Sequence, residues 1–157
     1  AFVEALEAIG YGKKYATIKT VKELEALCAD LRGGAEPKMA VTLCYYHQNY
    51  FPAVATTDVL SRVADVLACK PSELAFYPVP KLMIRRVGDH EAYSALRASE
   101  LGDGTLEVRE IADAMAYVNL FVDGPDLLTM MNEMVVKNKA AGLYDGCKMA
   151  VEEAMKM

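Results

Sequence analysis

An internal period of about 35 residues constrains the fold of this chain more than any other feature of its sequence. Four stretches open with a capping-type residue and place apolar residues four and seven positions later; the openers are Thr20, Thr56, Asp89 and Gly124. A second set of segments begins at similar intervals, near Pro37, Pro71, Glu107 and Gly142. A period of this size is typical of stacked helical hairpins, in which each unit buries its apolar face against its neighbours.

The period predicts an all-α fold, a right-handed α-solenoid-like array of about four helical hairpins followed by a C-terminal capping helix. We expect residues 1–157 to form one repeat domain. Its approximate units are 1–36, 37–70, 71–106 and 107–141, with a terminal helix in 142–157.

The fourth unit shows the helical pattern most clearly. Apolar residues recur at helical spacing from Glu107 to Val122, and Asp123-Gly124-Pro125 then breaks the chain before a partner helix over 126–138. A final helix over about 146–156 is either half of a fifth unit or a cap. In the second unit we expect helices from Pro37 to His47 and from Thr57 to Ala68.

The third unit fits the period least well, because Tyr77-Pro78-Val79-Pro80 interrupts its first helix. Two prolines two positions apart forbid a continuous helix. Either this helix is short and kinked, or residues 74–79 are extended and the repeat is locally broken.

Charge limits the kind of partner. The net charge is −5, and residues 107–157 alone sum to −4, which argues against a long RNA track along the whole array. A small basic cluster follows the double proline and consists of Lys81, Arg85 and Arg86. It is a solvated face or protein contact, or else a phosphate site for RNA. A second basic cluster has the same alternatives and consists of Lys13, Lys14, Lys19 and Lys22.

An aromatic group surrounds His47 in the second unit. Its members, Tyr45, Tyr46, Tyr50 and Phe51, are candidates for contact with a partner protein or for stacking on bases. At helical spacing, however, Tyr46, Tyr50 and part of this group are more often the core of a hairpin.

No motif indicates catalysis, a cofactor or a metal. The sequence contains no Gly-rich phosphate loop, nucleophile elbow or paired-carboxylate motif, so we expect no enzyme and no cofactor. Residues 99–110 imitate an EF-hand loop, but Leu101 stands where calcium needs an oxygen ligand. We interpret them as an inter-helix turn, with Gly102 and Gly104 ending one helix and Thr105 capping the next.

Four widely spaced cysteines form no CxxC pair and are interpreted as small buried apolar residues. They indicate a reducing compartment: the cytosol, the mitochondrial matrix or the plastid stroma. No stretch approaches the ~20 apolar residues of a transmembrane helix.

Two helix pairs, in 38–74 and 106–143, resemble the degenerate α-hairpin repeats of organellar proteins. The similarity is to octotricopeptide and RAP-type repeats, and more loosely to pentatricopeptide repeats. It is carried by a helix with small residues at Ala112, Ala114 and Ala116 and by the Asp-capped, Leu-rich helix at Asp126-Leu127-Leu128. The resemblance implies a mitochondrial or plastid protein that binds organellar RNA or belongs to a large organellar assembly.

Two functions remain open. The first is a non-catalytic scaffold or structural subunit that makes protein–protein contacts in a larger organellar complex. The second is an RNA-binding repeat protein of organellar RNA metabolism or of the organellar ribosome.

Overall fold

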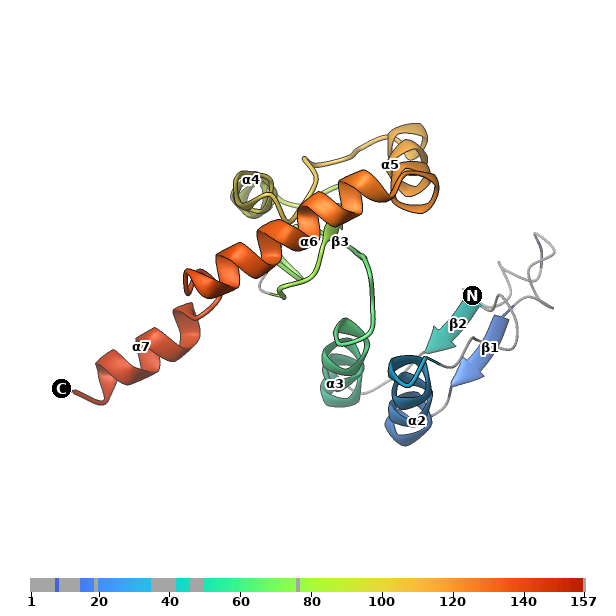
Figure 1. The fold of residues 1–157 in the computed structure, drawn as a ribbon, viewed down its shortest axis with the longest axis horizontal. Helices are drawn as coiled ribbons and strands as arrows, with labels where there is room; N and C mark the ends of the chain where they lie inside the picture. The colour runs from blue at the N-terminus through green and yellow to red at the C-terminus, as the bar shows by residue number, and fades with distance from the viewer. Residues whose placement is uncertain are drawn as a thin grey trace. The chain divides into compact units, whose positions relative to one another are not determined.

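Short strands alternate with helices from residue 15 to residue 69, and the elements named after residue 83 are all helices (Figure 1). The computed structural model describes residues 8, 15–18, 20–34, 42–45, 50–75 and 77–156, and most of these residues are helical. The chain divides into two compact units, Ala1–Val63 and Ala64–Met157. Each unit has its own parallel strands, so we describe each by itself.

In the first unit a helix connects two parallel strands. β1 (Tyr15–Ile18) pairs with β2 (Thr42–Tyr45), and α2 (Val21–Arg32) lies between them in sequence, as the crossover between parallel strands requires. α3 (Tyr50–Ser61) follows β2. The buried core of this unit joins α2 to α3 through Leu24, Cys28 and Val59.

In the second unit three parallel segments lie side by side. β3 (Leu67–Cys69) pairs with β4 (Lys81–Met83). On the other side of β4, residues 103–108 run parallel to it. The Lys81 N–H donates to the Asp103 carbonyl at 2.8 Å, and the Val108 N–H donates to the Met83 carbonyl at 2.8 Å. β4 is therefore the central segment, and all three of its residues are buried.

Helix α4 (Ala92–Leu101) connects β4 to residues 103–108 after a 3₁₀ turn at Asp89–Glu91. Its residues Ala95 and Ala98 pack with Cys69 and Met83 in the core of the second unit. Gly102 ends α4 with a φ of 73°, a left-handed conformation that favours glycine.

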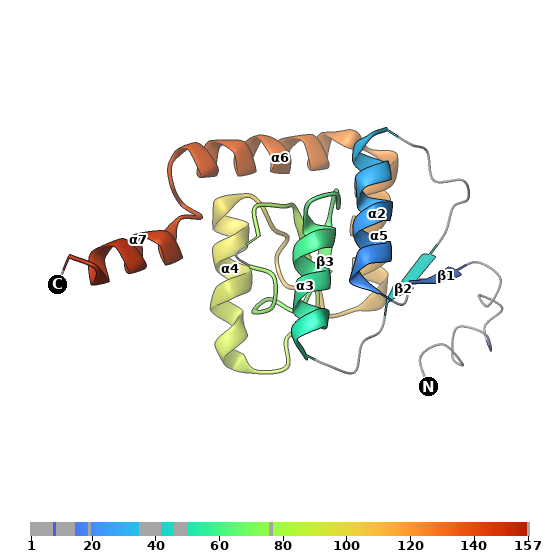
Figure 2. The ribbon, with the colours of Figure 1, turned by 90° about the horizontal axis from the view of Figure 1, so that it is seen from below.

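Three helices complete the second unit: α5 (Ile111–Asp123), α6 (Pro125–Ala140) and α7 (Gly146–Ala154). α6 supplies buried Met131, Val135 and Asn138, and Gly124 joins it directly to α5. In Figures 1 and 2, α7 extends beyond the end of α6, away from α5.

Several expected helices are confirmed. α2 begins after Thr20, whose hydroxyl accepts a hydrogen bond from the Glu23 N–H at 3.2 Å, and α6 begins after Gly124. The expected helix over 107–122 is α5, which begins later because residues 103–108 are extended beside β4. The terminal helix begins at Gly146, since Gly142 lies in a turn with a φ of 73°.

The all-α expectation is wrong for the described residues, because they include four short strands; the chain is mostly helical rather than wholly so. The expected helix from Pro37 to His47 is wrong in its described part, which is strand β2. Pro37 and His47 themselves lie outside the described residues. The expected helix from Thr57 to Ala68 is also wrong, because α3 ends at Ser61 and β3 begins at Leu67.

Two helices do not begin where the sequence predicts, and the segment around the double proline also differs from both predicted conformations. Thr56 lies inside α3, where its hydroxyl donates to the Pro52 carbonyl at 2.8 Å, and α4 begins three residues after Asp89. Residues 71–75 and 77–79 form turns and bends, so neither a kinked helix nor an extended bridge describes them. Turns and bends satisfy the geometry of Pro71 and Pro78 without a helix, and Pro80 directly precedes β4.

We expect Gly104→Ala to destabilise the second unit. A Cβ at position 104 would lie 2.6 Å from the Cβ of buried Ala98, so α4 and residues 103–108 would have to separate. The expected loss is about 1–3 kcal/mol in the free energy of unfolding, measured by urea titration.

Gly146→Ala is the matched control, because no atom lies within 4 Å of the Cβ that it would add. Equal urea midpoints for the two variants would contradict the close packing of α4 on residues 103–108.

Candidate functional site

The carboxyl ends of the parallel segments collect charged side chains at one edge of the second unit. In open parallel sheets, ligands bind beyond the carboxyl ends of the strands. Residues after β4, in the turn before α4, and at the end of residues 103–108 meet here. We call this group the charged edge; its members are Arg85, Arg86, Asp89, Glu91, Glu107 and Arg109.

Glu107 organises the arginines of the charged edge. Its carboxylate accepts hydrogen bonds from Arg86 Nη1 at 2.7 Å and from Arg109 Nε at 3.1 Å. Arg86 also donates its backbone N–H to Glu107 and its Nη2 to Asp89. Burial alone would raise the pKa of Glu107, but the hydrogen bonds from Arg109 and Arg86 outweigh burial and hold that pKa below its ordinary value.

Glu91 ties the turn before α4 to the turn after β3. The Ser72 hydroxyl donates to Glu91 Oε1 at 2.5 Å, and the Val87 N–H donates to Oε2 at 2.7 Å. These bonds, that of Ser72 foremost, lower the pKa of the buried Glu91 carboxyl to about 2. The charged form of Glu91 is therefore part of the folded structure.

Arg85 is the cation of the charged edge that remains available. It is exposed and forms no ion pair with a described residue. It lines a hollow of about 190 Å³ whose other charged residues are Arg86, Arg109, Asp89 and Glu107, which leaves an excess of one positive charge. This geometry can attract a phosphate or carboxylate from solution. Arg86 contributes less, because Glu107 and Asp89 already neutralise it.

Lys81 does not belong to this surface, although the sequence groups it with Arg85 and Arg86. Its side chain is 0% exposed, and its Nζ lies 2.9 Å from Asp103 Oδ2. A phosphate of RNA therefore cannot contact Lys81 in this structure. A central strand covered on both faces leaves a lysine no exposed side, which is why proximity in sequence misplaces it.

Asp103 joins Lys81 to Tyr144 inside the second unit. The Tyr144 hydroxyl donates to Asp103 Oδ2 at 2.6 Å, while Asp103 Oδ1 has no hydrogen-bond partner among the described residues. Burial lowers the pKa of Lys81, and burial together with the bond to Asp103 raises the pKa of Tyr144 to about 12. Lys81 and Asp103 are fully buried and Tyr144 is half-buried, so the three side chains form a polar network inside the second unit.

The aromatic candidates are only partly described. Tyr46 and His47 lie outside the described residues; the backbone of Tyr45 belongs to β2, and its side chain is outside the description. Tyr50 and Phe51 begin α3 and are 75% and 83% exposed, with ring centroids 5.7 Å apart in an edge-to-face pair. These two rings are accessible for contact with a partner.

An apolar stripe runs along α5, and sequence reasoning did not single it out as a surface. Ile111, Met115, Val118 and Val122 repeat at helical spacing and are between 36% and 82% exposed. We call these four residues the α5 stripe. Tyr117 and Phe121 lie on another side of α5 and are half-buried. A helix that is apolar on several sides is normally covered by protein, so the stripe is an unusual surface.

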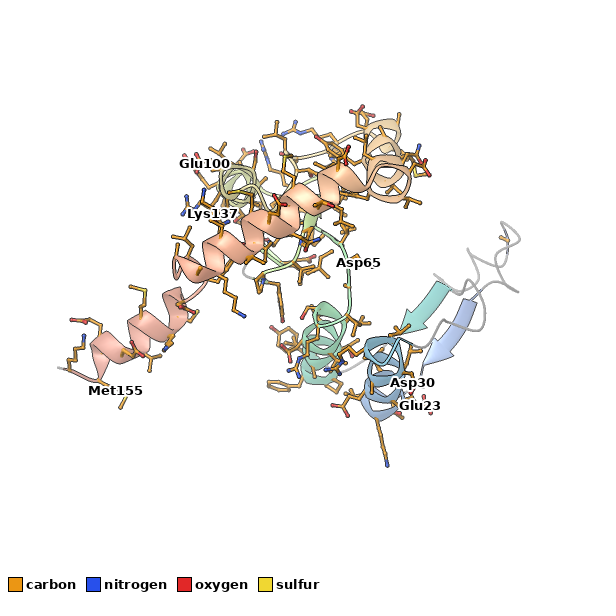
Figure 3. All side chains as sticks on the ribbon, viewed as in Figure 1. Glu23, Asp30, Asp65, Glu100, Lys137 and Met155 are labelled. Atoms are coloured by element: carbon orange, nitrogen blue, oxygen red, sulfur yellow. The ribbon has the colours of Figure 1, made fainter. Side chains whose placement is uncertain are left out.

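α7 carries a separate exposed apolar surface. None of its residues is buried, and Met149 and Val151 are both more than half exposed. Met155, labelled in Figure 3, lies just beyond α7 at the far end of the second unit and is also exposed.

The cysteine and turn expectations have mixed outcomes. Cys28 and Cys69 are buried, and burial raises the pKa of both thiols, but Cys147 is exposed; the Cys44 side chain lies outside the description.

The expected turn over residues 99–110 is confirmed at its start, because Gly102 ends α4. Thr105 does not cap the next helix, because its hydroxyl accepts the Met83 N–H at 3.0 Å within the core.

Sequence reasoning also missed Glu91, Asp103 and Glu107. For Glu91 the available signal is the apolar run from Val79 to Ile84, interrupted only by Pro80 and Lys81. Such a short run between turns is typical of a buried strand, and ligands bind beyond the carboxyl ends of parallel strands. Asp103 and Glu107 lie in a separate segment, and no local signal pairs them with that run.

The described residues include neither a metal-binding cluster nor a membrane-spanning helix. They contain no group of three or more His, Cys, Asp or Glu placed to hold a metal ion. None of the helices that the structure describes has the length and apolar character needed to cross a membrane.

We expect Glu91→Gln to reduce the pH dependence of stability in acid. The pKa of Glu91 is about 2 in the folded chain against an ordinary 4.5, so the unfolded chain takes up this proton first as the pH falls. The contribution of Glu91 is therefore complete above pH 4.5 and is lost between 4.5 and about 2. Urea unfolding at pH values across this window measures the slope.

Glu133→Gln, which removes an exposed carboxylate on α6, should leave that slope as in the unmodified chain. An unchanged slope in Glu91→Gln would show that Ser72 and the Val87 N–H do not stabilise the carboxylate.

Comparison with known proteins places the chain in a family without assigning an activity. No curated protein and no solved structure matches it. None of the matches links it to octotricopeptide, RAP-type or pentatricopeptide repeats, so that resemblance stays a prediction. Residues 1–155 match the model of a family described as a domain of unknown function (DUF6938), and the chain therefore belongs to this family.

Proposed function

We propose that this chain is a non-catalytic, protein-binding structural subunit of a larger organellar complex. The observation that carries the proposal is the α5 stripe, four large apolar side chains left exposed on one side of a thirteen-residue helix. Complete burial of one such side chain is worth about 1.5–3 kcal/mol. Covering the stripe with a partner would therefore supply much of the free energy of a stable interface.

Charge favours a partner of a different kind from this chain. Residues 107–157, which include α5, α6 and α7, carry a net charge of −4. Like charges facing one another across an interface are unfavourable, so a second copy is a poor occupant of the stripe. The complementary surface is an apolar patch bordered by Lys and Arg on another protein.

The expected architecture and location remain parts of this proposal. Of the expected right-handed array of stacked hairpins, the fourth unit has support, because its consecutive helices α5 and α6 contact each other. A reducing compartment, such as the mitochondrial matrix or the plastid stroma, is consistent with the buried thiols of Cys28 and Cys69.

We expect Met115→Glu to release the chain from its assembly. The substitution places a charge in the middle of the α5 stripe, where burial against a partner would leave it unpaired. A loss of 2 kcal/mol or more, the size typical of an interface hot spot, corresponds to about 30-fold or more in Kd. Gel filtration of native extracts containing the tagged variant measures the shift from the large assembly to the free chain.

Leu120→Glu is the matched control. It adds the same charge to the same helix, but position 120 lies about half a turn away from the stripe and faces the hollow lined by Leu106 and Val108. The proposal predicts that this variant stays in the assembly. If Met115→Glu also stays there, or if the unmodified chain elutes as a monomer, the stripe is not the interface.

RNA binding is the second candidate, and the exposure of Arg85 favours it. We expect Arg85→Ala to weaken binding to single-stranded RNA at low salt and to reduce the salt slope of log K by about 0.7, the value for one phosphate contact. Fluorescence anisotropy across a salt series measures both.

Arg62→Ala is the control for RNA binding, because Arg62 is exposed but already paired with Asp58. Identical salt slopes for the unmodified chain and Arg85→Ala, or no RNA binding at low salt, would eliminate this second function.

A further inference from the structure

A hollow of about 470 Å³ is lined by residues of α4 and by residues at the start of α7. We call it the α4–α7 hollow. It is distinct from the α5 stripe and the charged edge, since none of their residues lines it. Its size falls within the range of pockets that hold small molecules.

The walls of the α4–α7 hollow are mostly apolar. α4 contributes Ala98 and Leu101, and the turn before α7 contributes Leu143 and the ring of Tyr144. The Tyr144 hydroxyl is occupied, because it donates to Asp103 at 2.6 Å and also interacts with Asn138. Tyr144 is therefore fixed in place and offers the hollow its ring more than its hydroxyl.

Two polar groups on one face of α4 reach the α4–α7 hollow. Arg97 is the only charged residue among the described residues that line it, and Ser94 lies one helical turn before Arg97. Arg97 is held loosely, since its Nη1 lies 3.6 Å from Glu100 Oε2 and both side chains are more than half exposed. A guanidinium in this state is free to form a two-pronged hydrogen-bonded pair with a carboxylate.

We propose that the α4–α7 hollow binds a small molecule with an apolar body and one carboxylate, of the class of medium-chain fatty acids. The apolar body lies against Leu101, Leu143 and the Tyr144 ring. The carboxylate pairs with Arg97 and accepts a hydrogen bond from the Ser94 hydroxyl. This combination of an apolar lining with few polar groups is typical of small-molecule sites.

Cys147 gives the test its readout, because it lines the α4–α7 hollow and is exposed. The experiment measures the rate at which iodoacetamide alkylates Cys147 in the full chain, by mass spectrometry of the Cys147 peptide, during titration with decanoate. The titration stays below concentrations at which buried Cys69 reacts, so that the chain remains folded. We expect saturating decanoate to slow alkylation at least fivefold.

Three comparisons identify the recognised groups. Acetate, which lacks the apolar body, should give no protection, and decanol should protect only at higher concentration than decanoate. Arg97→Gln should raise the half-protecting concentration of decanoate about tenfold or more, which corresponds to 1.4 kcal/mol. Lys148→Gln removes a neighbouring cation that does not line the hollow and should leave protection unchanged.

Two results would overturn the proposal. Alkylation of Cys147 at the same rate with and without decanoate would show that the hollow takes no such ligand. Equal protection by decanoate in the unmodified chain and in Arg97→Gln would show that Arg97 does not recognise a carboxylate.

Discussion

Lys81 and Asp103 hold β4 against residues 103–108 through both their backbones and their side chains. The Lys81 N–H donates to the Asp103 carbonyl at 2.8 Å, the Thr105 N–H donates to the Lys81 carbonyl at 2.9 Å, and the two charged groups meet at 2.9 Å. This alignment fixes where residues 103–108 end, and so it places Glu107 opposite Arg86 at the charged edge. The same Asp103 accepts the Tyr144 hydroxyl, which connects the strands to the turn before α7.

A buried ion pair of this kind specifies an arrangement more than it stabilises one. Removing both charges from water costs several kcal/mol per ion. Asp103 Oδ1 accepts no hydrogen bond from the described residues that would offset this cost. Breaking the pair by removing one partner typically costs 3–5 kcal/mol, because the other charge is then buried alone. Any other register of β4 against residues 103–108 would separate Lys81 from Asp103 and carry that cost.

The sequence predicts the helices that have strong local signals and misses the strands that have none. Thr20 and Gly124 precede α2 and α6 as expected, since a capping hydroxyl and a Gly-Pro break act locally. β3 and β4 have three residues each, and short apolar runs cannot be distinguished from buried helix by periodicity. Within the second unit, a strand followed by a helix spans about as many residues as a helical hairpin, so the repeat predicted the wrong architecture for those segments.

The charged edge and the α5 stripe could not be predicted from the sequence for a related reason. Which charged side chains meet, and which apolar helix face stays exposed, depends on contacts between residues that are distant in sequence.

The α5 stripe is exposed in the isolated chain, and in the proposed assembly a partner covers it. Methionine oxidation by dilute hydrogen peroxide tests this directly, with Met83 and Met155 as internal references because they are 0% and 83% exposed. We expect Met115 to oxidise at a rate near that of Met155 in the isolated chain and near that of Met83 in the native assembly. Slow oxidation of Met115 in the isolated monomeric chain, or equal rates in both states, would contradict it.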